Sequence, residues 1–194
     1  NIELAISYMK KNNFSESKNI FNKIIEITNQ KKNKAQAYYW LGYISLMNEF
    51  ELDLSLEYFN LVNETMRSSK YSKQVRNYIS DIDSYNALLE EYNFLLSSKE
   101  DEIVVQENLN QYNIHSNNDI QNDIATKDSL LFIIAEKLFF DFNQKDLSIK
   151  KHNELIQTYP NSIYSDRSKK IVNQLINQIT FDNFSLDSLA LLRD

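Results

Sequence analysis

The chain has 194 residues, a formal net charge of −6, and only one glycine and one proline. Sheet-based folds need many turn residues, so this composition argues against all-β and parallel-sheet folds and favours long helices joined by short polar loops. The negative charge argues against general nucleic-acid binding, because neutralising phosphates needs clustered Lys and Arg.

Apolar residues recur at helical spacing in four segments of the N-terminal half. We expect helices at residues 2–11, 15–28, 35–47 and 52–66. Asn12 and Asn13 separate the first two, and Ser15 is the expected N-cap of the second. A polar, basic loop is expected at residues 29–33. The pattern therefore predicts two successive helical hairpins.

The rest of the chain continues the helical pattern with one interruption. Residues 71–96 form one long helical pattern that no breaker interrupts. Residues 97–126 lose both apolar density and periodicity, so we expect a polar insertion or loop, with a short helix at residues 102–109. Further helices are expected at residues 128–142, 146–159, 164–179 and 186–193, the last of them capped by Ser185.

Three segments of the chain can be aligned with one another. Ser17 and Phe21 in the first segment correspond to Ser55 and Phe59 in the second, at an offset close to the roughly 34-residue period of helix–turn–helix repeats. A small residue stands at the matching place in each preceding helix, namely Ala5, Gly42 and Ala135. Since Gly within a helix costs about 1 kcal/mol relative to Ala, Gly42 indicates a close helix–helix contact.

This arrangement resembles the tetratricopeptide repeat family. The matching residues are Leu4, Ala5 and Tyr8 in the first unit, Tyr38, Leu41, Gly42, Ser55 and Phe59 in the second, and Leu131, Ile134, Ala135, Leu138 and the closing Pro160 in the third. Two residues depart from the family pattern, because Ser45 stands where an aromatic is expected and His152 stands where Phe is expected.

The resemblance implies an all-α fold, a right-handed α–α superhelix built as a solenoid of helical hairpins. Residues 1–96 are then hairpins followed by a long helix, residues 97–126 are the polar insertion or loop, and residues 127–194 are a C-terminal hairpin with trailing helices. Each hairpin can bury only one face alone, so stacked neighbours would supply the core.

The junction from Tyr159 to Ser168 is similar to one that recurs in repeats of bacterial cell-envelope proteins, including the outer-membrane assembly lipoprotein and the Tol-Pal-associated periplasmic coordinator. This similarity implies a periplasmic or outer-membrane-associated place rather than a cytoplasmic one. No apolar run reaches the roughly 18–20 residues that span a bilayer. The chain begins at Asn1 without Met, so we expect a processed protein or part of a longer one, with a removed signal or anchor as an open alternative.

No set of residues points to catalysis or to a bound cofactor. Cys is absent, and His115 and His152 do not form the i, i+4 pair of a helical zinc site. His115 is expected to be solvated, and His152 to be half-buried within a helix pair. We therefore expect no enzyme activity, no cofactor and no metal.

In the tetratricopeptide family the first helix of each hairpin lines a concave groove. Carried over by resemblance, the candidate protein-binding residues are Tyr39, Tyr43 and Leu46 in the second hairpin and Phe132, Glu136 and Phe139 in the third. Aromatic side chains offer large contact areas at low entropy cost, which suits peptide recognition. The alternative is that these side chains pack against the next helix or against the insertion.

The sequence therefore predicts a non-enzymatic protein–protein interaction scaffold that binds a peptide or a partner helix in a concave groove. A role in bacterial envelope assembly follows from the resemblance alone. Two alternatives stay open: a structural subunit of a larger complex, and a helical regulatory domain of a longer enzyme. The identity of the partner and the oligomeric state also stay open.

Overall fold

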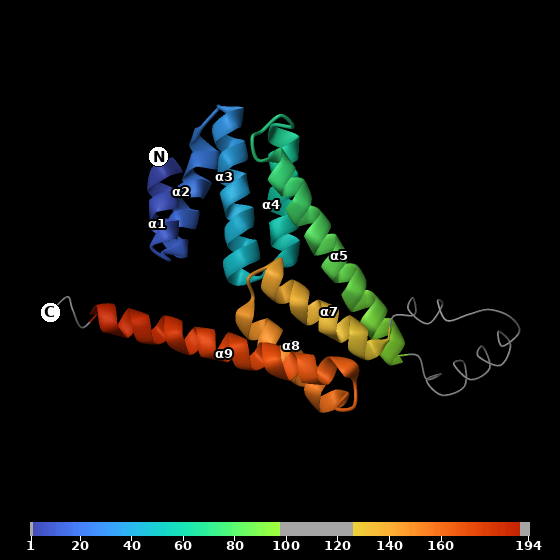
Figure 1. Ribbon diagram of the computed structural model, residues 1–194. Coiled ribbons are helices and arrows are strands. Elements are labelled where there is room, and N and C mark those ends of the chain that lie inside the picture. The colour runs from blue at the N-terminus through green and yellow to red at the C-terminus, as the bar shows by residue number, and fades with distance from the viewer. Residues whose placement is uncertain (1, 98–125, 191–194) are drawn as a thin grey trace, which may run out of the picture. The chain divides into compact units, whose positions relative to one another are not determined.

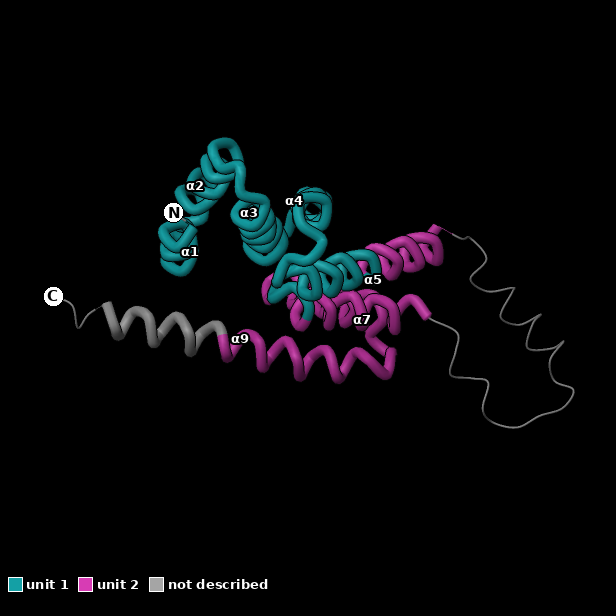
Figure 2. Tube along the Cα trace, turned by 90° about the horizontal axis from the view of Figure 1, so that it is seen from above, with its two compact units in different colours: residues 1–84, 141–144 teal, residues 85–140, 145–194 magenta. Residues whose placement is uncertain are grey.

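A computed structural model describes the backbone of residues 2–97 and 126–190, and the side chains as far as residue 178. Helices and short turns make up this part of the chain, and it contains no strand, so the predicted all-α class is confirmed (Figure 1). The chain divides into two compact units (Figure 2). Unit 1 comprises residues 1–84 and 141–144, and unit 2 comprises residues 85–140 and 145–194.

Unit 1 begins with two antiparallel hairpins, whose helices pack against one another in chain order (Figure 1). The helices are α1 (Ile2–Lys10), α2 (Phe14–Ile27), α3 (Lys31–Ile44) and α4 (Leu52–Thr65). Residues 72–84 of the long helix α5 (Ser72–Ser97) also belong to this unit. All five helices were predicted from the sequence, with boundaries that differ by up to four residues.

Two helix starts differ from the sequence prediction. Asn13, not Ser15, is the N-cap of α2, because its Oδ1 accepts a hydrogen bond from the Glu16 backbone N–H at 3.3 Å. The turn before it uses Asn12 in the left-handed region, with φ 58°. The third helix begins at Lys31, since lysines are good helix formers and the expected basic loop has no breaker.

The end of α3 is irregular in a way that the sequence did not predict. Residues Ser45–Glu49 form a π-helix, η1. It ends with a hydrogen bond from the Phe50 backbone N–H to the Ser45 carbonyl. Phe50 itself lies in the left-handed region, with φ 54°. The Phe142 ring packs edge-on against Phe50 at a centroid distance of 5.6 Å, and the Gln144 amide donates to the Met47 carbonyl at 2.9 Å. These contacts explain why residues 141–144 belong to unit 1.

Unit 2 contains α7 (Lys127–Phe140), α8 (Lys145–Thr158) and α9 (Ile163–Ala190), together with residues 85–97 of α5. The α7–α8 hairpin packs together, and α9 packs against both of its helices. The start of α7 is fixed to the α8–α9 turn, where Ser162 donates to the Asp128 carboxylate. Burial alone would raise the pKa of Asp128, but hydrogen bonds from Ser162 and Thr126 bring it below its usual value.

The predicted break within the last helical region is wrong. We expected one helix to end near Ile179 and another to begin after a Ser185 cap, but α9 is continuous as far as Ala190. Residues 180–185 contain no Gly or Pro, and the propensity cost of Asn, Ser and Thr in a helix is only a few tenths of a kcal/mol each. The predicted short helix at residues 102–109 lies outside the described residues, as do residues 98–125 as a whole.

The three aligned hairpins place corresponding residues in corresponding environments. Ala5, Gly42 and Ala135 are all buried, and so are the serines and aromatic rings aligned in the second helices: Ser17 with Phe21, Ser55 with Phe59, and Ser148 with His152. The Ser17 Oγ donates to the Ala5 carbonyl at 2.8 Å, and the Ser148 Oγ donates to the Ala135 carbonyl at the same distance. In the second hairpin Ser55 instead donates to Glu51 within its own helix.

The Gly42 contact is as close as the sequence predicted. A Cβ atom at Gly42 would lie 2.7 Å from Cε1 and 2.8 Å from Cδ1 of the Phe59 ring, closer than carbon atoms normally approach. Phe59 is fully buried, so its ring has little room to move away. Gly42 therefore lets the ring of the second helix pack directly on the backbone of the first.

We expect Ser17→Ala to lower the free energy of unfolding of unit 1 by about 1 kcal/mol, because it removes a buried hydrogen bond between helices. Ser15→Ala is the matched control, since Ser15 is exposed and Asn13 provides the cap. Trp40, the only tryptophan of the chain, lies in unit 1, so its fluorescence during urea unfolding measures both variants. Equal stabilities of the two variants would contradict the assignment of Ser17.

Candidate functional site

The candidate groove residues of unit 1 differ in exposure. Tyr39 is 3 % exposed and Leu46 is fully buried, whereas Tyr43 is half-buried. The Tyr39 ring stacks on the Tyr71 ring at a centroid distance of 4.1 Å and a tilt of 17°. Tyr39 and Leu46 are therefore core residues in this structure and present almost no surface to a partner, while Tyr43 keeps a partly accessible ring.

The start of α5 covers the tyrosine face of α3. Tyr78 of α5 lies 6.3 Å from Tyr43, stacks on Phe59 at 5.3 Å, and forms a hydrogen bond with the Tyr39 hydroxyl. Burial raises the pKa of Tyr39 far above its usual value, and the interaction with Tyr78 raises it further. The residues that fill this face, Tyr71 just before α5 and Tyr78 within it, were not among the predicted site residues.

In unit 2 the candidate residues divide in the same way. Phe132 is 5 % exposed, whereas Glu136 and Phe139 are half-buried. The Phe132 ring stacks on Tyr164 of α9 at 5.0 Å, and the Arg167 guanidinium lies over the same ring at 4.8 Å. Phe132 is thus a core residue at the contact between α7 and α9, and Glu136 and Phe139 are the accessible members of the predicted set.

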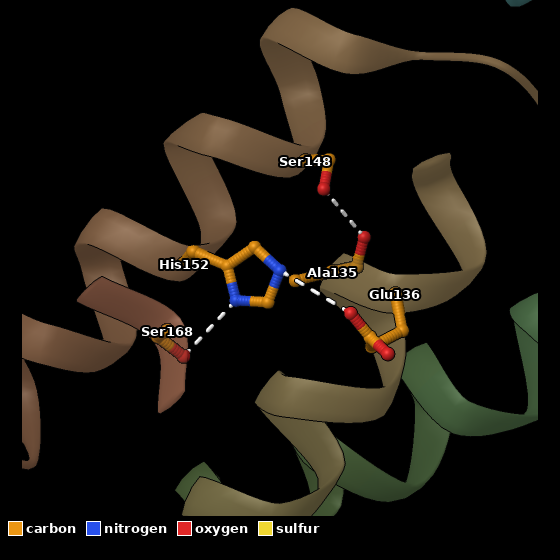
Figure 3. A network of polar contacts seen from close by, with 5 residues as sticks. All are labelled: Ala135, Glu136, Ser148, His152 and Ser168. Atoms are coloured by element: carbon orange, nitrogen blue, oxygen red, sulfur yellow. Dashed lines mark hydrogen bonds and ion pairs between the residues drawn. The ribbon is translucent and has the colours of Figure 1, made fainter. Parts of the chain in front are cut away.

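A buried polar network adjoins this contact (Figure 3). His152 is fully buried, and its Nδ1 lies 3.0 Å from the Ser168 Oγ of α9. Its Nε2 faces the Glu136 carboxylate at 3.7 Å, beyond hydrogen-bond distance, and has no hydrogen-bond partner among the described residues. Burial, with a smaller contribution from the Arg167 charge, lowers the pKa of His152 to about 4, so the ring is neutral at pH 7.

The order Ser168–His152–Glu136 resembles a nucleophile, base and carboxylate, but its geometry does not support catalysis. Ser168 is fully buried, so its oxygen cannot reach a substrate. The carboxylate is too far from Nε2 to orient the ring. Burial raises the pKa of Glu136, and the Arg167 charge opposes that rise. Hydrogen bonds instead join α8 to α9 through His152 and Ser168, and α8 to α7 through Ser148 and the Ala135 carbonyl. The sequence expectation of half-buried packing at His152 understated its burial.

A small apolar cavity lies elsewhere, at the open end of the first hairpin. It has a volume of about 240 Å³ and is lined by Ile2, Ile24, Ile27, Thr28 and Asn33. None of its lining residues is titratable, and none belongs to the predicted groove. The cavity therefore offers a mainly apolar surface, in which Thr28 and Asn33 supply polar side chains and no charged group is present.

The described part of the chain offers neither a metal site nor a membrane-spanning helix. Within it, no group of three or more His, Asp or Glu side chains is placed to hold a metal ion. The same residues include no helix that is both long enough and apolar enough to cross a membrane. His115 lies outside the described residues. Comparisons with protein-family models, with curated proteins and with solved structures found no match.

Sequence reasoning also missed the α9 members of the network. Ser165, Ser168, Val172 and Leu175 are all buried and recur at spacings of three and four residues, so they share one face of α9. This periodicity was a detectable signal, because serines that continue an apolar stripe lie on its buried side. The long-range pairing of Ser168 with His152 has no such local signature.

Proposed function

We propose that this protein is a non-enzymatic scaffold that binds a peptide or a partner helix on the inner face of stacked, tetratricopeptide-like hairpins. The observation that carries the proposal is the recurrence of one packing set in three hairpins: a buried small residue, a buried serine and a buried ring. Such hairpins form extended binding surfaces when they stack as a right-handed superhelix. The bacterial envelope is the proposed place, on the resemblance of the junction at residues 159–168 alone.

Each unit, taken by itself, offers accessible candidate residues for such binding: Tyr43 in unit 1, and Glu136 with Phe139 in unit 2. Tyr43 and Phe139 would supply apolar contact area, and Glu136 would supply a hydrogen-bond acceptor for a peptide N–H. Tyr39, Leu46 and Phe132 would act indirectly, because they hold the helices that carry these three side chains.

A random dodecapeptide library displayed on phage would test the proposal, using the full chain as bait. We expect Phe139→Ala to weaken binding of a selected peptide by tenfold or more, which corresponds to at least about 1.4 kcal/mol for a hot-spot aromatic. Ile133→Ala is the matched control, because Ile133 is an apolar residue of the same helix, is 43 % exposed and is not a candidate groove residue. Failure to select any peptide, or equal losses in both variants, would contradict the proposal.

A second candidate function, a structural subunit of a larger complex, is favoured by large apolar side chains at the surface. Ile27, Phe94, Phe140 and Ile163 are each more than two-thirds exposed, at 80 %, 69 %, 70 % and 84 %. Aromatic residues such as Phe94 and Phe140 are enriched in the cores of protein–protein interfaces. Sedimentation of the full chain over a range of concentrations distinguishes the two candidates, since an assembly subunit should associate without an added peptide.

A further inference from the structure

The third hairpin differs from the other two at one core position. Phe21 and Phe59 fill this position in unit 1, and His152 fills it in unit 2. All three side chains are fully buried. A phenylalanine ring needs no polar partner, whereas an imidazole brings two ring nitrogens into the core, and both must carry protons when the ring is charged. One hairpin of the three therefore has an ionisable group where the others have hydrocarbon.

The side chains that face His152 cannot accommodate its charged form as they stand. From α7, Glu136 faces Nε2 at 3.7 Å and the Phe132 ring packs edge-on at 5.5 Å. From α9, Ser168 contacts Nδ1, and the Arg167 guanidinium and the Tyr164 ring both pack on Phe132. The negative charge of Glu136 favours protonation of His152, and the positive charge of Arg167 opposes it. The cost of burying a charged ring therefore decides that the neutral form of His152 is favoured.

We propose that His152 makes the third hairpin a pH-dependent conformational switch, the latch. Protonation of the imidazole opens the buried contact between α8 and α9, the seam, while unit 1 stays folded. The seam opens because the charged ring needs a second acceptor, and the closed packing supplies no protein acceptor for Nε2 at hydrogen-bond distance. Opening exposes the face of α9 that carries Ser168, Val172 and Leu175. The latch does not depend on the binding function proposed above.

Proton linkage gives the sign of the stability change at the α8–α9 contact and the pH range in which it occurs. The pKa of His152 is lower in the folded chain, about 4, than its ordinary value of 6.5, so the unfolded or opened form takes up the proton first. The stability is therefore fully present above pH 6.5 and is lost as the pH falls from 6.5 towards 4. Between pH 7 and pH 5 the open-to-closed ratio of the seam should rise about 20-fold.

Other shifted groups of unit 2 do not reproduce this behaviour. The pKa values of Asp128 and Asp166 are both lowered from 3.8, so their contributions are lost only in stronger acid. The pKa of Glu136 is raised by burial, so its protonation favours the closed form in acid and acts in the opposite direction. A loss of protection between pH 7 and pH 5 therefore reports on His152.

Hydrogen exchange of the full chain at pH 7 and pH 5, expressed as protection factors to remove the intrinsic pH effect, tests the proposal. We expect amides of α8 and of the first turns of α9 to lose about 20-fold protection at pH 5, and amides of α1–α4 to stay within twofold. His152→Phe, which restores the residue of the other two hairpins, should abolish the loss. An equal pH response in His152→Phe, or an equal loss in α1–α4, would overturn the proposal.

A second measurement covers the case in which His152→Phe fails to fold. The imidazole signals of the wild-type chain are followed by NMR from pH 7.5 to pH 4, with His115→Gln used to assign the two histidines. We expect the His152 signal to keep its neutral position until the α8 and α9 resonances change with it. A His152 signal that titrates near pH 6.5 in a folded unit 2 would refute the latch.

Discussion

Gly42→Leu should unfold the second hairpin, with a loss of about 3 kcal/mol or more from the free energy of unfolding of unit 1. The first side-chain atom alone would lie 2.7 Å from the Phe59 ring, and three further carbons would have to enter a fully buried site. Helix propensity acts in the opposite direction, because Leu is favoured over Gly by about 0.8 kcal/mol within a helix. The clash is the larger effect, so the net result is destabilisation, measured by urea unfolding followed through Trp40 fluorescence.

A double-mutant cycle separates the ring contact from backbone effects. Gly42→Ala should cost less in a Phe59→Leu background than in the wild type, by at least about 1 kcal/mol, because the smaller side chain leaves room for the new methyl group. Ala5→Gly is the matched change in the first hairpin, where a methyl group is already accommodated beside Phe21. It should cost only about 1 kcal/mol, through propensity. Additive effects at Gly42 and Phe59 would show that their contact does not limit packing.

The helices could be predicted because the signal for them is local. Apolar residues at spacings of three and four, together with the scarcity of Gly and Pro, identify helices wherever they occur. The buried small residues at Ala5, Gly42 and Ala135 were also predictable, since repetition at one period shows which positions share an environment. The sequence therefore indicated the hairpins and their closest internal contacts.

Helix ends were harder to predict, because several weak signals compete within a few residues. Ser15 and Asn13 are both acceptable N-caps, and the backbone geometry at Asn13 decides between them. The π-helix at Ser45–Glu49 was not predictable, since it depends on a left-handed Phe50 that packs against the distant Phe142. Such a conformation is unfavourable for a non-glycine residue unless tertiary contacts support it.

The predicted groove was only partly accessible for a similar reason. Tyr39 and Tyr43 are four residues apart and share one face of α3, so periodicity treats them alike. Their exposures differ because Tyr71 and Tyr78, more than 30 residues later in the chain, cover Tyr39 more completely. The same holds for Phe132 and Phe139 on α7, where Tyr164 and Arg167 cover the first. Periodicity identifies an apolar face, but contacts with residues distant in the chain decide which half of that face is covered.

Because their burial differs, Tyr39→Ala and Tyr43→Ala should lower the free energy of unfolding by clearly different amounts. Tyr39→Ala should cost about 3–5 kcal/mol, because it removes a buried ring that stacks on Tyr71 and leaves a cavity. Tyr43→Ala should cost about 1 kcal/mol or less, since its half-buried ring leaves a site that solvent can enter. Urea unfolding of each variant, followed by far-UV circular dichroism as well as Trp40 fluorescence, measures both.

Tyr39→Phe separates the contribution of the Tyr39 ring to stability from that of its hydroxyl. It keeps the stacked ring and removes the hydroxyl that shares a hydrogen bond with Tyr78, so it should cost about 1 kcal/mol. Trp40 lies 5.0 Å from Tyr39 in an edge-on contact, so a changed emission baseline is expected in Tyr39→Ala even before unfolding. If Tyr39→Ala were as stable as Tyr43→Ala, the α5 segment would not be closed over α3 in solution. Tyr39 would then be as accessible as Tyr43, and both tyrosines would belong to the binding surface.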